Sequence, residues 1–448
     1  MASDLHESTG ENTGFSRRIE EDDLQKPRPV YCIWEITLRC DLGCKHCGSR
    51  AGRVRSQELT TEQCFDVVHQ LAALGLREIV LIGGEAYLRD DWPDIAKEIV
   101  KSGMSCSMTT GARNLNQERV QQAVDAGVRS ISISIDGLER THDSIRNAKG
   151  SWKAAVDAAR RVSESSMALS VNTQINRLSM PELPMIADLL VEMQVKAWQI
   201  QLTVAMGNAA DRPEMLLQPF ELLELFPKLV EIKKEKLIPN GIGLFPANNI
   251  GYFDVYEEWI RAGGEHGVHW TGCPAGLWAL GIESDGTVKG CPSLPTTPYA
   301  GGNILDLSLE DIVLKTEPLR RLRERTLEDL WGFCKTCYYA DICKGGCSWT
   351  SHSLLGRPGN NPYCIHRATE LKKQGLRERV TKVEDATGLP FDHGRFELVV
   401  EPLDSPDPLP LQMPSPADTS LQSDGLWHRD ELQDILKVIQ KGKIFSSQ

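Results

Sequence analysis

The chain has 448 residues, of which 41% are hydrophobic and 25% charged, and its formal net charge is −12. This is the composition of a globular protein with room for two or three domains. The acidic charge without a basic stripe argues against a nucleic-acid partner, no apolar run is long enough to span a membrane, and the polar first residues contain no signal peptide. Thirteen cysteines without a secretion signal argue against a disulfide framework and for metal ligation in a reducing cytoplasm.

Apolar strands alternate with amphipathic helices over the first half of the chain. Period-two and β-branched patterns predict six strands, at residues 30–37, 78–82, 104–109, 130–135, 168–175 and 197–204. Helical spacing with polar caps predicts five intervening helices, at residues 60–74, 91–102, 116–126, 151–165 and 181–193. Right-handed crossovers would join such strands into a parallel sheet. The sequence therefore predicts an α/β fold with six strands in an open partial barrel, because the two further units of an eight-stranded barrel are not found.

The remaining segments are less regular. Residues 1–29 are polar and are predicted to be flexible. No element is assigned to residues 240–270, and a cysteine-rich region follows from Cys273 to Cys364. The other predicted elements are a helix at 220–236, a charged helix at 371–385, a proline-rich linker at 402–416 and a short amphipathic helix at 431–440. This last helix docks on the body, binds a partner or does neither, and its sequence leaves the three open.

Three cysteines, Cys40, Cys44 and Cys47, follow the first strand with spacings x3 and x2. They fall on a loop at the carboxyl end of that strand, where α/β sheets carry their chemistry. Crowded thiolates repel one another unless a metal neutralises them, and thiolates at this density suit zinc or iron–sulfur. A structural zinc would need a fourth ligand, and His46 beside Cys47 would make a strained chelate. An iron–sulfur cube held by three cysteines instead leaves one iron open to a substrate or cofactor.

The Cys-x3-Cys-x2-Cys spacing after a first strand resembles that of the radical S-adenosylmethionine (SAM) superfamily. The residue before the third cysteine is usually aromatic in that family, and here it is His46. The resemblance implies that Cys40, Cys44 and Cys47 hold a [4Fe–4S] cluster whose open iron chelates the amino and carboxylate groups of SAM. One electron from the cluster then cleaves the sulfonium to give a 5′-deoxyadenosyl radical.

Two further segments are candidates for SAM contacts. After the second strand, Gly83 and Gly84 let the backbone approach a ligand closely, and Glu85 offers an acceptor for an ammonium group. The resemblance implies that this segment holds the SAM amino group, and the alternative is an ordinary strand–helix turn. After the fourth strand, Ser134 and Asp136 share one face. Similar segments in the family face SAM, and here the alternative is a capped turn.

Other polar residues at strand ends have two possible roles. The Thr109-Thr110-Gly111 segment occupies the place of a family turn near SAM. Side-chain amides on the fifth and sixth strands need hydrogen-bond partners, which SAM, substrate or the protein itself could supply; they belong to Asn172, Gln174, Gln199 and Gln201. Arg146 either meets a carboxylate or lies on the surface. No residue is assigned a catalytic role from sequence.

A second cysteine constellation lies in the C-terminal half. Its seven members resemble the SPASM pattern, a C-terminal domain of radical SAM enzymes that carries auxiliary iron–sulfur clusters. The resemblance implies one [4Fe–4S] cluster on Cys334, Cys337, Cys343 and Cys364, and a second on Cys273, Cys291 and Cys347. Because residues 274–290 contain no cysteine, the second cluster either has an open iron that could bind substrate or is closed by another residue. The alternative for the whole block is a zinc domain, since Cys-x2-Cys is a common zinc half-site.

Four other positions give no support for a functional role. Cys32, Cys64 and Cys106 lie in apolar patterns and are predicted to be plain buried cysteines. Sulfatase-maturing members of the resembling family place an aspartate directly after the second SPASM cysteine, as a catalytic base. Here Pro292 follows Cys291, which disfavours that activity.

The resemblance divides the chain and implies a function. We expect a flexible segment at 1–29, a radical SAM partial barrel, (β/α)6, at 30–235, a connecting segment at 236–272, a SPASM domain at 273–370, an extension at 371–400, and the linker with its helix at 401–448. The family inference is hydrogen abstraction from a ribosomally made precursor peptide, leading to a cross-link, an epimer or a backbone excision. Residues 1–29 are too few for a leader-binding domain, so we expect a separate leader-binding partner and an external electron donor. The alternatives are a radical SAM enzyme for a small molecule or protein side chain, and a non-catalytic zinc scaffold.

Overall fold

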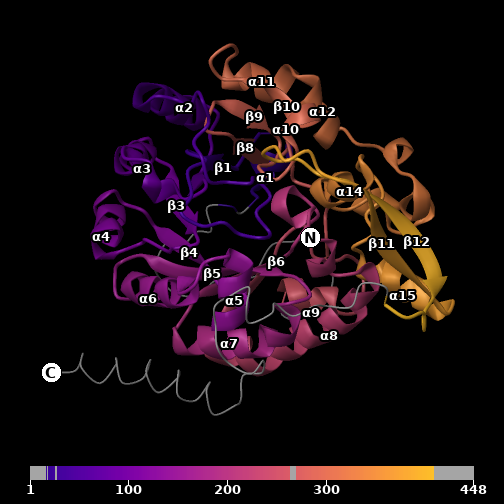
Figure 1. Ribbon diagram of the computed structural model, residues 1–448. Coiled ribbons are helices and arrows are strands. Elements are labelled where there is room, and N and C mark those ends of the chain that lie inside the picture. Colours follow the sequence, from indigo (N-terminus) through magenta and orange to yellow (C-terminus); the bar gives the residue numbers. More distant parts are fainter. Residues whose placement is uncertain (1–16, 18, 26–27, 263–268, 408–448) are drawn as a thin grey trace.

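A ten-stranded sheet forms the centre of the computed structural model, which describes residues 17, 19–25, 28–262 and 269–407 (Figure 1). Its strand order is β10-β9-β8-β1-β2-β3-β4-β5-β6-β7. The six predicted strands pair in parallel in chain order, which confirms the open partial barrel. They are β1 (Tyr31–Glu35), β2 (Glu78–Ile82), β3 (Ser105–Thr110), β4 (Ser130–Ser134), β5 (Ala168–Ile175) and β6 (Ala197–Leu202).

The five predicted helices lie outside this sheet and bury one face against it (Figure 1). In the first of them, the Thr60 side chain accepts a hydrogen bond from the Gln63 backbone amide in a capping box, which fixes where the helix begins. A further short helix, α5 (Glu139–Arg146), follows β4 and was not expected from sequence. The predicted helices are α2 (Thr61–Ala73), α3 (Trp92–Lys101), α4 (Gln117–Asp125), α6 (Ser151–Ser163) and α7 (Leu183–Glu192).

Four short strands extend the sheet at its two edges. β7 (Gly243–Pro246) pairs in parallel with β6, although it lies in the segment that was expected only to connect two domains. On the other side, β8 (Ala279–Ile282) pairs in parallel with β1, and β9 (Thr287–Lys289) and β10 (Ala300–Asn303) continue in antiparallel. The cysteine-rich region is therefore joined to the barrel through β1, directly before the first cysteine loop.

The other helices cover the second half of the sheet and the cysteine-rich region (Figure 1). The predicted helix at 220–236 is present as α8 (Leu222–Ile232), which runs on into a π turn at Lys233–Leu237. Helix α9 (Glu257–Ala262) occupies part of the stretch that had no assignment. The rest are α10 (Thr296–Tyr299), α11 (Leu309–Lys315), α12 (Glu317–Arg323), α13 (Ala340–Cys343), α14 (Ser348–Leu355) and α15 (Ile365–Lys373).

The predicted helix at residues 371–385 is wrong. Helix α15 ends at Lys373, Gly375 follows with a positive φ, and the chain continues as β11 (Leu376–Glu384). This strand pairs in antiparallel with β12 (Arg395–Pro402), so that the two form a hairpin beside α14 (Figure 1). The charged residues of β11 suggested a helix, but the cross-strand pairing of Val380 with Leu398 decides the structure.

Part of the segment predicted to be flexible is ordered. Residues Glu21–Gln25 form a short helix, α1, in which Asp23 is buried and binds Arg77 and Arg28. The predicted helix at 431–440, and the linker beyond residue 407, lie outside the described residues. Among the residues that are described, no helix has both the length and the apolar character that crossing a membrane requires.

The main core lies between the sheet and its helices. Cys32, Cys64 and Cys106 are buried within it, as predicted. Trp34, Trp92 and Trp198 are among the largest fully buried side chains, and burying an apolar side chain of this kind contributes at least about 1.5–3 kcal/mol. This rigid core holds the strand ends at which the functional loops begin.

We expect Asp143→Ala to destabilise the turn between α5 and α6. The buried Asp143 carboxylate accepts hydrogen bonds from the Gly150 and Trp152 backbone amides and from the Ser151 hydroxyl, at 2.5–2.9 Å. Removing it leaves buried donors unpaired, so urea denaturation should show a loss of about 2–4 kcal/mol. Asp157→Ala, at a half-exposed position in α6, is the control, and equal losses in the two variants would contradict this account.

Candidate active site

The first cysteine loop leaves β1 at the carboxyl end of the sheet. Cys40, Cys44 and Cys47 line a cavity of about 310 Å³ at the mouth of the barrel. Burial is the main reason why the pKa of the Cys44 thiol is raised to about 12; Arg146 opposes this rise and the neighbouring Cys47 adds to it. Three thiols in this setting become thiolates when a cation neutralises them, which is the behaviour of a metal site.

The two glycines after β2 pack against this loop. The Gly84 amide donates to the Thr37 carbonyl at 2.9 Å, and the Glu85 amide donates to the Arg39 carbonyl at 2.8 Å. A Cβ on Gly84 would lie 2.0 Å from the Arg39 oxygen, and one on Gly83 would lie 2.4 Å from the Thr37 oxygen. Sequence reasoning assigned these glycines to close approach of a ligand. They do line the cavity, but the contact that excludes a side chain is with the cysteine loop itself.

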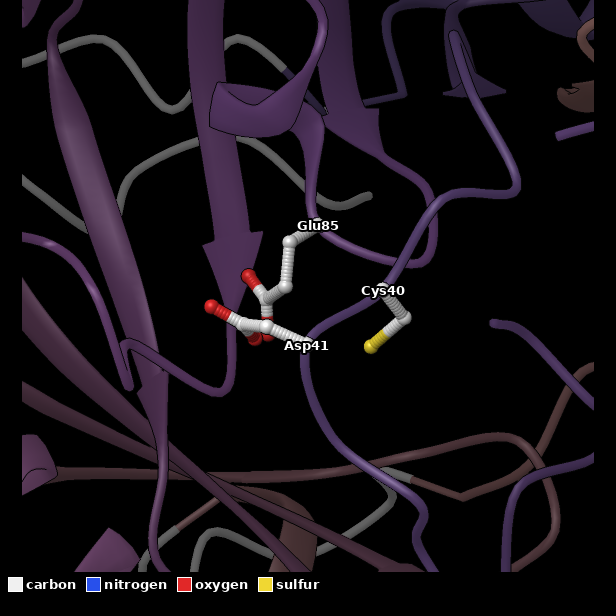
Figure 2. A group of neighbouring side chains, drawn as sticks. All are labelled: Cys40, Asp41 and Glu85. Carbon is white, nitrogen blue, oxygen red and sulfur yellow. The ribbon is translucent and has the colours of Figure 1, made fainter. Parts of the chain in front are cut away.

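Glu85 is held beside the cysteine loop by the neighbouring strand. Figure 2 shows its carboxylate close to Cys40 and Asp41, and the ligand atoms of the three lie within 4.8 Å of one another. The carboxylate accepts hydrogen bonds from the Gly111 amide, at 2.7 Å, and from the Thr110 hydroxyl. Burial raises the pKa of Glu85 to about 7, while these hydrogen bonds lower it. The Thr110-Gly111 turn therefore acts on the cavity partly by fixing the Glu85 acceptor.

Asp136 does not face the cavity, contrary to the sequence expectation. Its buried carboxylate lies 3.0 Å from His46 Nε2 and 2.5 Å from Arg146 Nη2. The backbone N–H of Gln174 donates to the other oxygen of this carboxylate at 2.9 Å. Although burial opposes it, Arg146 and His46 keep the pKa of Asp136 below its usual range. Asp136 is an internal anchor that ties the cysteine loop to α5 through His46 and Arg146.

Arg146 is buried and not on the surface. Besides Asp136, its guanidinium contacts Cys44 Sγ at 3.7 Å, and it lines the cavity. It therefore stabilises negative charge on the sulfur of one cysteine of the loop.

Polar side chains from β4, β5 and β6 form the inner wall of the cavity. The buried Asn172 Oδ1 has no hydrogen-bond partner in the part of the chain that the structure describes. A buried acceptor of this kind is costly unless a ligand pairs with it. The wall residues are Ser134, Asn172, Gln174, Gln199 and Gln201.

The structure separates the seven C-terminal cysteines into two groups. Cys273, Cys291 and Cys347 line a second cavity of about 310 Å³, in which the Ser348 hydroxyl donates to Cys273 Sγ at 3.2 Å. The other four line a small cavity of about 20 Å³ that Tyr252 also lines; they are Cys334, Cys337, Cys343 and Cys364. Repulsion within each group adds to the effect of burial in raising the thiol pKa values of Cys347 and Cys364 to about 12.

The second cavity adjoins the first one. Seven residues line both, so that a molecule seated between them would touch the surroundings of two cysteine groups. They are Arg17, Ile33, Gln199, Gln201, Pro292, Ser293 and Trp349.

Two family models match the chain. That of the radical SAM superfamily covers residues 34–190, and that of the SPASM iron–sulfur cluster-binding domain covers residues 273–338. The chain is a radical SAM enzyme with a SPASM domain.

Its relatives act on different substrates. It is 27% identical over 350 residues to an AdoMet-dependent heme synthase of Methanosarcina barkeri, which covers 76% of this chain and 97% of the relative. It is 25% identical over 358 residues to the PqqA peptide cyclase of Rhizobium meliloti, with coverages of 79% and 89%. The structure of anSMEcpe with bound AdoMet has the same fold, with a TM-score of 0.60, 17% identity and coverages of 76% and 96%.

The residues present fit the cofactors of this family. A radical SAM domain binds a [4Fe–4S] cluster and SAM, and a SPASM domain binds auxiliary iron–sulfur clusters. Groups of three and four unpaired thiols are suitable donor sets for such clusters. The open side of the first cysteine loop, with an acceptor at Glu85 and the unpaired Asn172 Oδ1, fits a polar molecule such as SAM.

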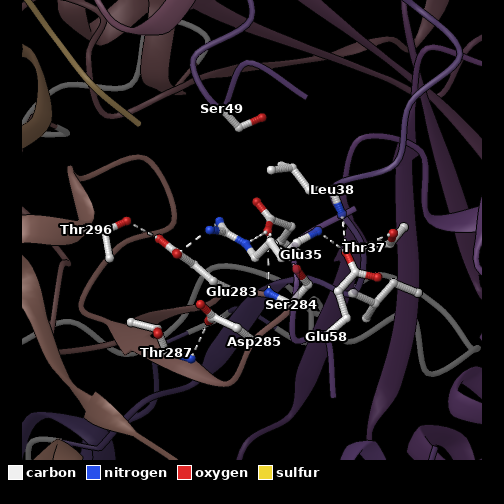
Figure 3. Close-up of polar contacts among 12 residues, drawn as sticks. Glu35, Thr37, Leu38, Ser49, Glu58, Glu283, Ser284, Asp285, Thr287 and Thr296 are labelled. Atoms are coloured by element: carbon white, nitrogen blue, oxygen red, sulfur yellow. Dashed lines mark hydrogen bonds and ion pairs between the residues drawn. The ribbon is translucent and has the colours of Figure 1, made fainter. Parts of the chain in front are cut away.

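Sequence reasoning missed a buried ionic network at one side of the radical SAM cavity (Figure 3). Glu35, the last residue of β1, lines the cavity and accepts hydrogen bonds from Arg55 Nε, at 3.0 Å, and from the Ser284 hydroxyl, at 3.2 Å. Arg55 also pairs with Glu283, which binds the buried Lys289 at 2.6 Å. A carboxylate inside the apolar strand 30–37 was the one sequence signal for this network.

We expect Gly84→Ala to prevent cluster assembly on the first cysteine loop. The new methyl group would meet backbone atoms that cannot move without shifting Cys40. Anaerobic reconstitution should give a folded protein that lacks one cluster, about four iron atoms per chain by metal analysis. Gly52→Ala is the matched control, because nothing lies within 4 Å of the added carbon. Normal iron content in Gly84→Ala would refute the steric argument.

We expect Glu35→Gln to flatten the pH dependence of stability. Burial raises the pKa of Glu35 to about 7, while Arg55 lowers it. A carboxyl whose pKa is higher in the folded than in the unfolded state binds its proton more tightly when the protein is folded. Its contribution to the free energy of unfolding is therefore complete at low pH and is lost as the pH rises through about 7. Between the ordinary carboxyl range and pH 7, the unfolding free energy of the wild type should fall by up to about 3 kcal/mol relative to the variant. Parallel denaturation curves across this range would contradict the expected shift.

Proposed function

We propose that this radical SAM enzyme abstracts a hydrogen atom from a ribosomally synthesised precursor peptide. The observation that carries the proposal is the pair of adjoining cavities, which gives a substrate access to two cysteine groups at once. The product is then a peptide with a cross-link, an epimerised residue or an excised backbone unit.

Each cysteine group has a role in this proposal. Cys40, Cys44 and Cys47 hold the cluster that binds SAM. The Glu85 carboxylate accepts a hydrogen bond from the SAM ammonium group. The remaining residues of the SAM pocket are Gly83, Gly84, Ser134 and Asn172. When reduced, the bound cofactors supply a 5′-deoxyadenosyl radical. Cys334, Cys337, Cys343 and Cys364 hold one auxiliary cluster, and Cys273, Cys291 and Cys347 hold the other. The barrel wall excludes water and orients the reacting carbon.

The cavity linings favour a peptide over a tetrapyrrole, the second candidate suggested by the heme-synthase relatives. A porphyrin carries several carboxylates and would need cations. Among the described residues, the two arginines that line the cavities are already paired, Arg17 with Glu78 and Arg146 with Asp136. Gln199 and Gln201 line both cavities, and their amides match the hydrogen-bonding groups of a peptide backbone.

The proposal implies two partners and a setting. A separate protein would bind the leader of the precursor, and an external donor would supply the electron. Thiols that hold clusters must stay reduced, and the cytoplasm provides reducing conditions.

We expect the anaerobically reconstituted protein to convert SAM to 5′-deoxyadenosine with a strong reductant. The Cys40→Ala/Cys44→Ala/Cys47→Ala variant should lose this activity by at least about a hundredfold, because the cluster that binds SAM is absent. Mass spectrometry measures the product. Deoxyadenosine at equal rates from the variant, or zinc in place of iron in the anaerobically purified wild type, would refute the assignment.

The substrate is decided by a competition. Peptides encoded beside the gene, with and without a neighbouring leader-binding protein, are compared with Fe-coproporphyrin III as additions to the same assay. A mass change in a peptide supports the proposal, whereas consumption of the porphyrin alone would establish the second candidate.

A further inference from the structure

The tip of the β11–β12 hairpin, residues 385–394, reaches the radical SAM cavity from the far end of the chain. Phe391 lines this cavity and is 8% exposed. The hairpin lies beyond the residues matched by either family model, and its strands contact α14 and α15. The hairpin therefore contributes an aromatic side chain to the wall of the cavity and is not confined to the protein surface.

The hairpin tip is clamped to the first cysteine loop. The Asp392 carboxylate binds Arg50, three residues after Cys47, through Nε at 2.8 Å and Nη2 at 3.3 Å. The Asp392 carbonyl accepts a hydrogen bond from the Gly207 amide, in the loop after β6, at 2.8 Å. Two contacts thus tie the tip to the cysteine loop and to the loop after β6, which pack against each other through the Asn208 amide and the Cys47 carbonyl at 2.9 Å.

The same aspartate shapes the tip internally. Its Oδ2 accepts hydrogen bonds from the Thr387 hydroxyl and from the amides of Gly388 and Leu389, at 2.5–3.2 Å. These bonds make residues 387–392 a compact turn whose position follows the position of Arg50.

Phe391 has a left-handed backbone with φ of +58°. A bulky residue in this region is strained, and such strain persists where the surrounding structure enforces it, often at functional sites. The strained backbone aims the ring at the two cations of the buried network, with Lys289 Nζ 3.8 Å from the ring centroid and Arg55 5.9 Å from it. The ring therefore lines the cavity, which the two cations do not, and contacts both of them in cation–π interactions.

We propose that the hairpin tip is the roof of the active site and that Phe391 is a specificity-determining residue that packs against an apolar target side chain of the substrate. Phe391 shares the cavity lining with Pro292, Met206 and Trp349, which carry no charge. Trp349 Nε1 lies 3.0 Å from Met206 Sδ, so that the polar atoms of this wall are paired with each other. The part of the proposal that concerns the target rests on the proposed function.

The first test needs no substrate. The full-length reconstituted chain is exposed to an iron chelator without oxygen, and loss of the SAM-sensitive electron paramagnetic resonance signal is followed. We expect Phe391→Ala to lose this signal about tenfold faster than the wild type, the effect of removing contacts worth about 1.4 kcal/mol. Leu389→Ala is the matched control, because Leu389 belongs to the same turn but is 65% exposed. Equal rates of signal loss for the two variants would refute the proposal that the hairpin tip covers the active site.

The second test uses the peptide that the wild type modifies. We expect Phe391→Ala to form at least about fivefold less peptide product per 5′-deoxyadenosine, because the radical is made while the target is poorly held. Phe391→Leu, which keeps most of the volume, should be intermediate, and this variant also guards against a folding defect in Phe391→Ala. Coupling in both variants equal to that of Leu389→Ala would overturn the specificity role. If the wild type modifies no peptide, the proposed function and the contact with a peptide both fail, while the chelation result still decides the roof.

Discussion

The close packing of the Gly83–Gly84 backbone against the first cysteine loop is the constraint on which the site depends. Two amide–carbonyl hydrogen bonds join the end of β2 to this loop, and neither glycine has space for a side chain. The rest of the loop is long and irregular, so this contact fixes the position of the loop relative to the strand ends. Glu85, which follows directly, then reaches the cavity at a fixed distance from Cys40.

Charges buried around the loop complete its attachment. Asp136 holds His46 and Arg146 from one side, and Arg146 contacts Cys44. On the other side, Arg55 lies between Glu35 and Glu283, which joins the loop to β8 and the SPASM region. Buried ion pairs of this kind give little net stability but strongly oppose the loss of one partner. They therefore suit a role in fixing geometry.

The parts that local sequence patterns determine were predictable. Strand periodicity located β1–β6, and spacing identified Cys40, Cys44 and Cys47 as one group of thiols. The division of the seven C-terminal cysteines into two groups came from the resemblance to the SPASM pattern. The sequence could not place Phe391 or Asp392, because their partners are distant in the chain, as Arg50 is from Asp392, and only the intervening fold brings them together. The error at 371–385 arose because charged residues are tolerated on a half-exposed strand. Asp136 points away from the cavity because its carboxylate binds His46. His46 stands where this family usually has an aromatic residue, and the sequence alone does not show that it pairs with Asp136.

The bond between Arg50 and Asp392 also bears on how the protein is made. A ribosome releases the cysteine loop long before it releases the hairpin tip, and domains fold in that order during synthesis. Until then Arg50 can pair with Asp211 but not with Asp392, and the hairpin tip does not yet contribute Phe391 to the cavity wall. If the tip covers the site as proposed, Cys40, Cys44 and Cys47 are accessible to a cluster donor until the β11–β12 hairpin is in place.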